Sequence, residues 1–231
     1  VMRGITRFPG VRYPVLVPNE RGLERARAAG ADAIALFTAA TDEFAQANVG
    51  ATIAGTFERF APVIERAKAE KVWVRGYVSV AFGCPYAGPV SADAVVDVTE
   101  QLLAAGCDEI CLADTIGVGI PADVDATLDA VSRSLPPADL ALHFHDTTGN
   151  ALANVQVALE RGVRIFDSAA GGLGGCPFAP GAPGNLATES LLEFLQRAGL
   201  RTGVDLAGVC LATDLLRGYV SRLGPAPTPS A

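Results

Sequence analysis

The sequence predicts an α/β fold in which parallel strands alternate with helices. The architecture it favours is an incomplete TIM (β/α)8 barrel with about six β/α units. Short β-branched runs alternate with longer amphipathic segments along the chain. Polar residues gather at the carboxyl ends of several expected strands, which is where barrel active sites are assembled. An open doubly wound sheet competes with this reading, and the number of units alone favours that sheet.

Each element rests on a local signal. Pro18 ends the first strand, Gly30 and Gly106 stop two helices, and Pro121 opens another. The expected strands, in chain order, are 12–17, 33–37, 72–80, 109–113, 139–145 and 164–169. The expected helices are 21–29, 52–68, 92–105, one beginning at 121, 151–160, 185–198 and 206–220. These elements predict one domain over 1–223 and a flexible Pro-rich tail over 224–231.

Composition excludes several classes of protein. Apolar residues make up 50% of the 231 residues, which predicts a packed core and not a disordered chain. The net charge of −7, without a basic run, argues against nucleic-acid binding. No apolar stretch approaches the roughly 20 residues of a membrane span. Five cysteines without a CxxC pair indicate a reducing compartment, so we expect a cytoplasmic location.

A His-Phe-His motif carries the two histidines of the chain, His143 and His145. Residues two apart on a strand point to the same side, so both imidazoles can reach one metal ion. Asp146 follows, where it could orient one imidazole. A mixed nitrogen and oxygen ligand set suits Mg²⁺, Mn²⁺ or a catalytic Zn²⁺. The competing interpretation is two incidental histidines at a strand end.

A glycine- and proline-rich loop spans residues 171–185 and contains Cys176. Glycines allow the backbone to approach a ligand closely, and a thiol on such a loop is placed like a reactive group. Alternatively, Cys176 is a small residue in a tight turn. Asn185 closes the loop, either as a functional amide or simply as the cap of the next helix.

Arg75 and Asp114 are two further candidates, placed on or directly after expected strands. Arg75 stands among apolar residues, where a charge needs either an anionic ligand or a structural ion pair. Asp114 ends the fourth strand and could be an acid–base group, a carboxylate supporting other site residues, or a cap. Its position alone slightly favours the structural role.

Together these runs resemble hydroxymethylglutaryl-CoA lyases over nearly the whole chain. The matching stretches are FPGVRYPVLVPN, RGYVSVAFGCPYAG, DTIGVG, HFHDTTGNALAN and GLGGCPFAPGAPGN, the last being the most specific. The resemblance implies a TIM barrel that cleaves 3-hydroxy-3-methylglutaryl-CoA, an acyl-CoA, into acetyl-CoA and acetoacetate with a divalent metal, Mg²⁺ or Mn²⁺. It assigns metal binding to His143, His145 and Asn185, catalysis to Cys176, Asp114 and His143, and substrate binding to Arg75.

The chain also departs from the family pattern. Members begin with a strand that carries an Arg-Asp pair, whose Asp is a metal ligand, and this chain starts where the third unit of the family begins. We therefore expect the chain alone to bind metal weakly and to turn over little substrate.

Other functions stay open. A 2-isopropylmalate or homocitrate synthase, or a 4-hydroxy-2-oxo acid aldolase, would share the His-X-His site but is not expected to carry the GLGGCP loop. A non-catalytic remnant would keep the fold alone. A homodimer is possible, and we expect no nucleic-acid or membrane partner.

Overall fold

Six parallel strands form one sheet in the part of the chain that the computed structural model describes, residues 1–175, 184–217 and 219. Their order in the sheet is their order along the chain. A doubly wound sheet would reverse its strand order at one point, so this arrangement excludes it and confirms the barrel-type winding. The strands are β1 (Val15–Leu16), β2 (Ala33–Ala39), β3 (Trp73–Ser79), β4 (Glu109–Asp114), β5 (Leu140–Phe144) and β6 (Ile165–Asp167).

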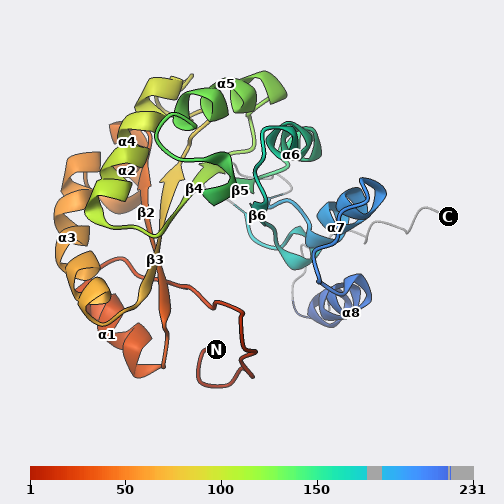
Figure 1. Cartoon of the computed structure of the whole chain (residues 1–231), viewed down its shortest axis with the longest axis horizontal. Helices are drawn as coiled ribbons and strands as arrows, with labels where there is room; N and C mark the ends of the chain where they lie inside the picture. The colour runs from red at the N-terminus through yellow and green to blue at the C-terminus, as the bar shows by residue number, and fades with distance from the viewer. Residues whose placement is uncertain (176–183, 218, 220–231) are drawn as a thin grey trace.

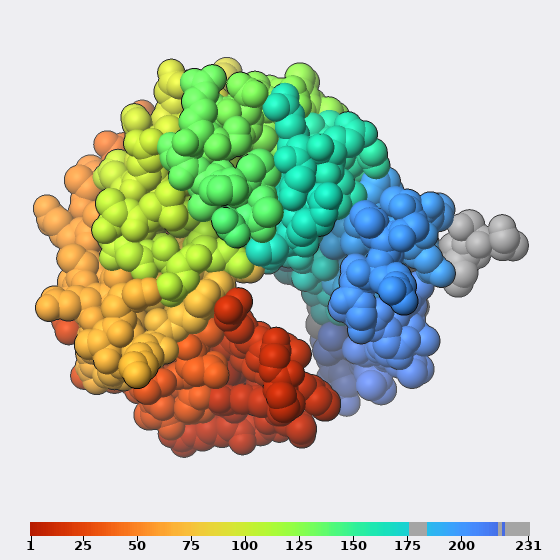
Figure 2. All heavy atoms as spheres, viewed as in Figure 1, coloured from red at the N-terminus to blue at the C-terminus, as the bar shows by residue number. Residues whose placement is uncertain are grey.

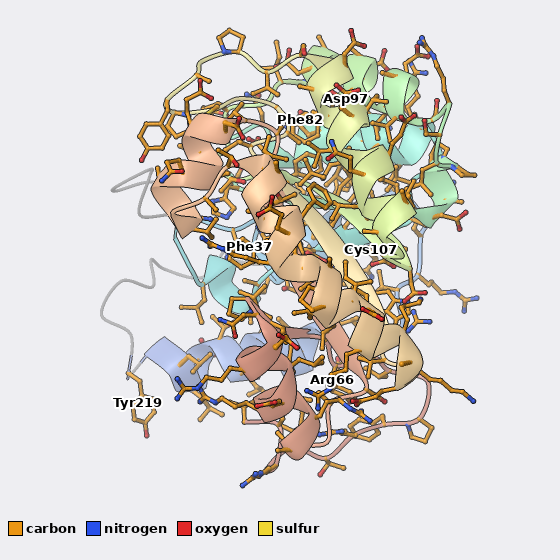
Figure 3. The ribbon with its side chains drawn as sticks, turned by 90° about the vertical axis from the view of Figure 1, so that its left-hand side faces the viewer. Phe37, Arg66, Phe82, Asp97, Cys107 and Tyr219 are labelled. Carbon is orange, nitrogen blue, oxygen red and sulfur yellow. The ribbon has the colours of Figure 1, made fainter. Side chains whose placement is uncertain are left out.

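Helices follow the outer side of this sheet, as Figure 1 shows. They are α1 (Glu20–Ala28), α2 (Asp42–Val49), α3 (Ile53–Ala69), α4 (Ala92–Ala105), α5 (Pro121–Val131), α6 (Ala151–Glu160), α7 (Thr188–Arg197) and α8 (Leu206–Arg217). Two 3-10 turns complete the described elements, η1 (Pro137–Asp139) and η2 (Ala170–Gly172). Neighbouring helices also touch one another: Arg66 on α3 forms an ion pair with Glu24 on α1 at 3.4 Å (Figure 3).

The sheet is not closed among the described residues, because β1 and β6 each pair with a single neighbour. Figure 2 shows the consequence, an opening at the centre of the molecule between the N-terminal segment and the C-terminal helices. The fold is therefore an incomplete barrel, as the sequence predicts. None of the described helices combines the length and the hydropathy needed to cross a membrane.

The two faces of the sheet differ in chemistry. Leu36, Val74 and Leu112 point to the helix layer and are fully buried. The inner face carries polar groups, because strand register aligns them: Arg75 pairs with Glu109, and His143 pairs with Asp167. Residues paired across neighbouring strands share a face. The concave side of the sheet is thus lined by charge, and it positions the candidate site.

Most expected elements are confirmed, with three differences. Helix α2 was not expected. Strands β1 and β6 are shorter than the expected 12–17 and 164–169, and each is an edge strand that pairs on one side only. The helix expected from 185 begins at Thr188, because Asn185 and Ala187 instead form isolated bridges to His145 and Ala169. The expected tail, 224–231, lies outside the described residues.

Candidate active site

The two histidines lie at the carboxyl end of β5. His143 is half-buried on the inner face, and His145 follows the strand and is buried. Their ring centroids are 5.2 Å apart. The backbone of His145 bridges to Asn185, which brings the third predicted ligand to the same place. The structure therefore brings His143, His145 and Asn185 together.

Asn185 is not a helix cap, which was the competing interpretation. Its Nδ2 donates to the carbonyl oxygen of Leu173 at 2.8 Å, and α7 begins three residues later with Ala187 as its N-cap. This hydrogen bond fixes the amide so that Nδ2 faces the loop backbone. The Oδ1 atom is left on the other side of the group.

Two buried polar atoms of this cluster, Nδ1 of His145 and Oδ1 of Asn185, make no hydrogen bond of normal geometry with any described residue, although the two side chains are close enough to influence each other. A buried donor or acceptor without a hydrogen bond costs about 1–3 kcal/mol of stability, so such atoms call for an explanation. A nitrogen and an amide oxygen are suitable ligands for a divalent cation. The residues present therefore fit the metal that the sequence predicts. No cluster of three His, Cys, Asp or Glu side chains forms an alternative metal site in the described ranges.

The protonation of His145 agrees with this role. Burial in the first place, and the neighbouring His143 in the second, lower the pKa of His145 to about 4. The imidazole is therefore neutral near pH 7, which is the form that binds metals.

A carboxylate that the sequence analysis missed lies behind His143. Asp167 on β6 has its Oδ2 atom 3.4 Å from Nδ1 of His143. Tyr77 donates to the same oxygen at 2.7 Å, and Arg75 donates to Oδ1 at 2.8 Å. Burial alone would raise the pKa of Asp167, but the close contact with His143, the charge of Arg75 and the hydrogen bond from Tyr77 outweigh it and lower the pKa to about 2. Its position within the sixth expected strand, 164–169, was the one sequence signal that could have identified Asp167.

Asp146, expected as the carboxylate that orients a histidine, has a different task. Its Oδ1 accepts a hydrogen bond from the backbone nitrogen of Ala151 at 3.0 Å, at the start of α6. The expectation about Asp146 is therefore wrong, since the carboxylate in contact with an imidazole is Asp167. The reason is that Asp146 lies just past the strand, where the free amides of the next helix are closer.

Arg75 lies in a buried ion-pair network. Its guanidinium donates to Glu109, to Asp167 and, at 3.0 Å, to the hydroxyl of Tyr77. These contacts match the structural ion pair that was the alternative interpretation of Arg75. Direct contact with a substrate stays a prediction.

Asp114 holds the turn that follows β4. Its Oδ1 accepts from the backbone nitrogen of Val118 at 3.1 Å, and Oδ2 accepts from that of Gly119 at 3.0 Å. Because Asp114 pairs in register with Phe144, it lies on the opposite face of the sheet from His143. Burial raises the pKa of Asp114 to about 6. The geometry supports a role in shaping the loop, and a catalytic role stays a prediction.

The same turn requires glycine. A Cβ atom at Gly119 would lie 2.8 Å from the Cβ of Phe82, and Gly117 adopts a φ of +65° against Thr147. Thr148 and Asn154 bind the carbonyl oxygens of Gly117 and Gly119, at 2.8 and 2.9 Å. The loops after β4 and β5 therefore form one connected rim beside the histidines.

Cys176 lies outside the described residues, so its predicted catalytic role stays a prediction.

Comparison with known proteins gives consistent matches. The family model described as HMGL-like matches residues 1–216. The chain is 50% identical over 222 residues to the cytoplasmic 3-hydroxy-3-methylglutaryl-CoA lyase of Rattus norvegicus, covering 96% of the chain and 65% of that relative. The HMG-CoA lyase structure from Brucella melitensis has a TM-score of 0.91 at 51% identity, with 94% of this chain and 77% of that one covered. An Acinetobacter baumannii HMG-CoA lyase in complex with coenzyme A and 3-methylmalate has a TM-score of 0.90 at 38% identity, with 99% and 73% covered.

Proposed function

The chain belongs to the HMGL-like family, and from this premise we propose that the protein containing it cleaves 3-hydroxy-3-methylglutaryl-CoA into acetyl-CoA and acetoacetate. One observation carries the proposal: the unpartnered Nδ1 of His145 and Oδ1 of Asn185 lie beside His143 at the carboxyl end of β5. The names of the similar lyases support the substrate, and the coenzyme A bound to one of them supports an acyl-CoA.

We assign metal binding to His143, His145 and Asn185, with Mg²⁺ or Mn²⁺ as the expected ion. A divalent cation held there supplies Lewis acidity toward the hydroxyl and carbonyl oxygens of the substrate. The neutral state of His145, set by its burial, keeps its nitrogen free to coordinate. The Leu173 carbonyl holds the amide of Asn185 in place from the other side.

The cleavage has two proton transfers. The tertiary hydroxyl loses its proton as the carbon–carbon bond breaks, and the acetyl-CoA enolate that leaves gains one. We propose that a water molecule beside His143, which is half-buried on the inner face, accepts the first proton, and that the thiol of Cys176 donates the second as a general acid. Asp114 contributes by holding the rim between Thr115 and Gly119 through its two amide contacts. The contacts of Arg75 support a role in fixing Asp167.

The test is an assay of the natural full-length protein with 3-hydroxy-3-methylglutaryl-CoA and Mg²⁺ or Mn²⁺, following both products. Stoichiometric acetyl-CoA and acetoacetate, abolished in a His145→Ala variant, is the expected result. Condensation of acetyl-CoA with a 2-oxo acid, or cleavage of a 4-hydroxy-2-oxo acid, would instead identify one of the related barrel enzymes. Turnover of none of these would overturn the proposal. The cytoplasmic location and the homodimer also stay predictions.

A further inference from the structure

We propose that Asp167 is a positioning residue that fixes the ring of His143, with Arg75 and Tyr77 holding Asp167 in turn. The inference deepens the proposed function, because it concerns the same site. It begins from register: His143 and Asp167 are paired across β5 and β6, so the two side chains stand next to each other on the inner face. Oδ2 of Asp167 lies 3.4 Å from Nδ1 of His143.

The carboxylate itself is held from two sides. Arg75 reaches Oδ1 at 2.8 Å and Tyr77 reaches Oδ2 at 2.7 Å, and both come from β3. Arg75 is anchored further by Glu109 on β4. Because Arg75, Glu109 and Asp167 are mostly buried on strands, the carboxylate has little freedom to turn away from the imidazole.

This arrangement determines which nitrogen of His143 is available. A carboxylate accepts hydrogen bonds, so it favours the tautomer that carries its proton on Nδ1. The Nε2 atom then keeps its lone pair for a ligand. Loss of such an outer carboxylate partner typically weakens metal affinity about 10–100-fold.

The network also gives Arg75 a role that does not need substrate contact. Without a cation beside it, a buried Asp167 carboxylate would tend to turn toward water. Arg75 holds this carboxylate in place at Oδ1, and Tyr77 fixes its second oxygen. Arg75 thus acts on His143 through Asp167.

The experiment measures the tautomer of His143 and the affinity for metal separately. The chain has two histidines, so a ¹⁵N-histidine spectrum contains two ring systems, and His145→Gln assigns them. In the wild type without metal we expect His143 protonated on Nδ1. In Asp167→Asn we expect a larger Nε2-protonated fraction and, by calorimetry with Mn²⁺ alone, a Kd raised about 10–100-fold. Asp97→Asn is the matched control, the same change at an exposed position on α4 (Figure 3).

Tyr77→Phe is the second variant, since it removes one hydrogen bond to Asp167 and keeps the ring. It should shift the same two readouts in the same direction, by less, even if Asp167→Asn folds poorly. An unchanged tautomer and an unchanged Mn²⁺ affinity in folded Asp167→Asn, or in Tyr77→Phe if the first does not fold, would overturn the inference. If this chain binds no Mn²⁺ but the variants show the expected tautomer shift, metal binding by this chain is contradicted and the Asp167–His143 relation stands.

Discussion

Both carboxylate oxygens of Glu189 accept a hydrogen bond from the backbone nitrogen of Gly171, at 3.0 and 2.8 Å. Glu189 lies in the first turn of α7, and Thr213 of α8 donates to the same carboxylate. One buried side chain therefore ties the start of the glycine-rich loop to the two C-terminal helices.

Replacing this carboxylate should loosen the loop and both helices at once. Glu189→Gln is expected to lower the free energy of unfolding by about 1.5–3 kcal/mol, the contribution of a hydrogen bond to a charged group. Chemical denaturation of the variant checks the value. Glu193→Gln, four residues further along α7, is the matched control and should change stability by less than about 0.5 kcal/mol. Equal effects at both positions would contradict the tie.

Metal binding should stabilise the protein through Asn185 and His145. At free Mn²⁺ about a hundred times Kd, the expected gain is about 2.7 kcal/mol, measured as a rise in Tm. Asn185→Ala removes one ligand and should reduce this gain at the same Mn²⁺ concentration, and EDTA should remove it in both proteins. If Asn185→Ala responded to Mn²⁺ as the wild type does, its Oδ1 would not be a ligand.

The buried imidazole of His145 predicts a pH dependence of stability. Its pKa is about 4 in the folded protein and 6.5 as a free group. Between those values the unfolded chain binds the proton and the folded chain does not, so this residue lowers stability as pH falls from about 6.5 to about 4. The loss amounts to about 3 kcal/mol by the usual conversion of pKa into free energy. Denaturation of His145→Gln in EDTA should show a correspondingly weaker loss over this range, and a curve parallel to the wild type would refute it.

Asp114 should act in the opposite direction over the same range. Its pKa is raised from 3.8 to about 6, so the folded protein holds the proton that the unfolded chain releases. Its contribution to stability is therefore lost as pH rises from about 4 to about 6. Relative to the wild type, Asp114→Asn should gain stability as the pH increases through that window. The two residues partly cancel in the native protein, which is why the single variants are the informative measurement.

Lys71 offers a prediction away from the site. It follows α3 with a φ of 57°, an unfavourable conformation for a side chain, and it is exposed. Glycine takes this conformation freely and is favoured after a helix end. Relief of about 1–2 kcal/mol of left-handed strain should outweigh the about 0.4–1 kcal/mol of entropy that glycine adds to the unfolded chain. Lys71→Gly is therefore expected to raise the free energy of unfolding, measured by denaturation, by about 0.5–1 kcal/mol. Lys71→Ala keeps the strain and should give no gain; a gain of the same size there would point to the lost lysine charge instead.

Local signals explain how much of the fold the sequence predicts. Helix α4 begins and ends as expected, because Ser91 caps its start and Gly106 is left-handed at its end. Helix α2 has comparable signals, a Thr41 cap and a left-handed Gly50, but it is short and lacks a clear apolar stripe. Helix α2 could be predicted only if its capping residues were given more weight than hydrophobic periodicity.

The candidate site divides in the same way. His143 and His145 are recognisable because residues two apart on one strand point to the same side. Asp167 is a single polar residue on a short strand, and its importance comes from register with β5. That pairing is tertiary, so no local pattern contains it. Asp146 drew attention because it adjoins the histidines in sequence, although in space it belongs to α6.

The sequential strand order has a consequence for how the molecule assembles. Each strand adds beside the one made just before it, so the sheet can grow in step with synthesis from the N-terminal side. The Arg75–Asp167 pair is different, since it joins residues 92 positions apart. Closing a loop of that length costs conformational entropy before the contact can stabilise the chain. The pair is therefore expected to form only after β4, β5 and β6 are in place. We therefore expect the contact that supports His143 to form late in folding, so that the site is completed only on a chain whose sheet is already built.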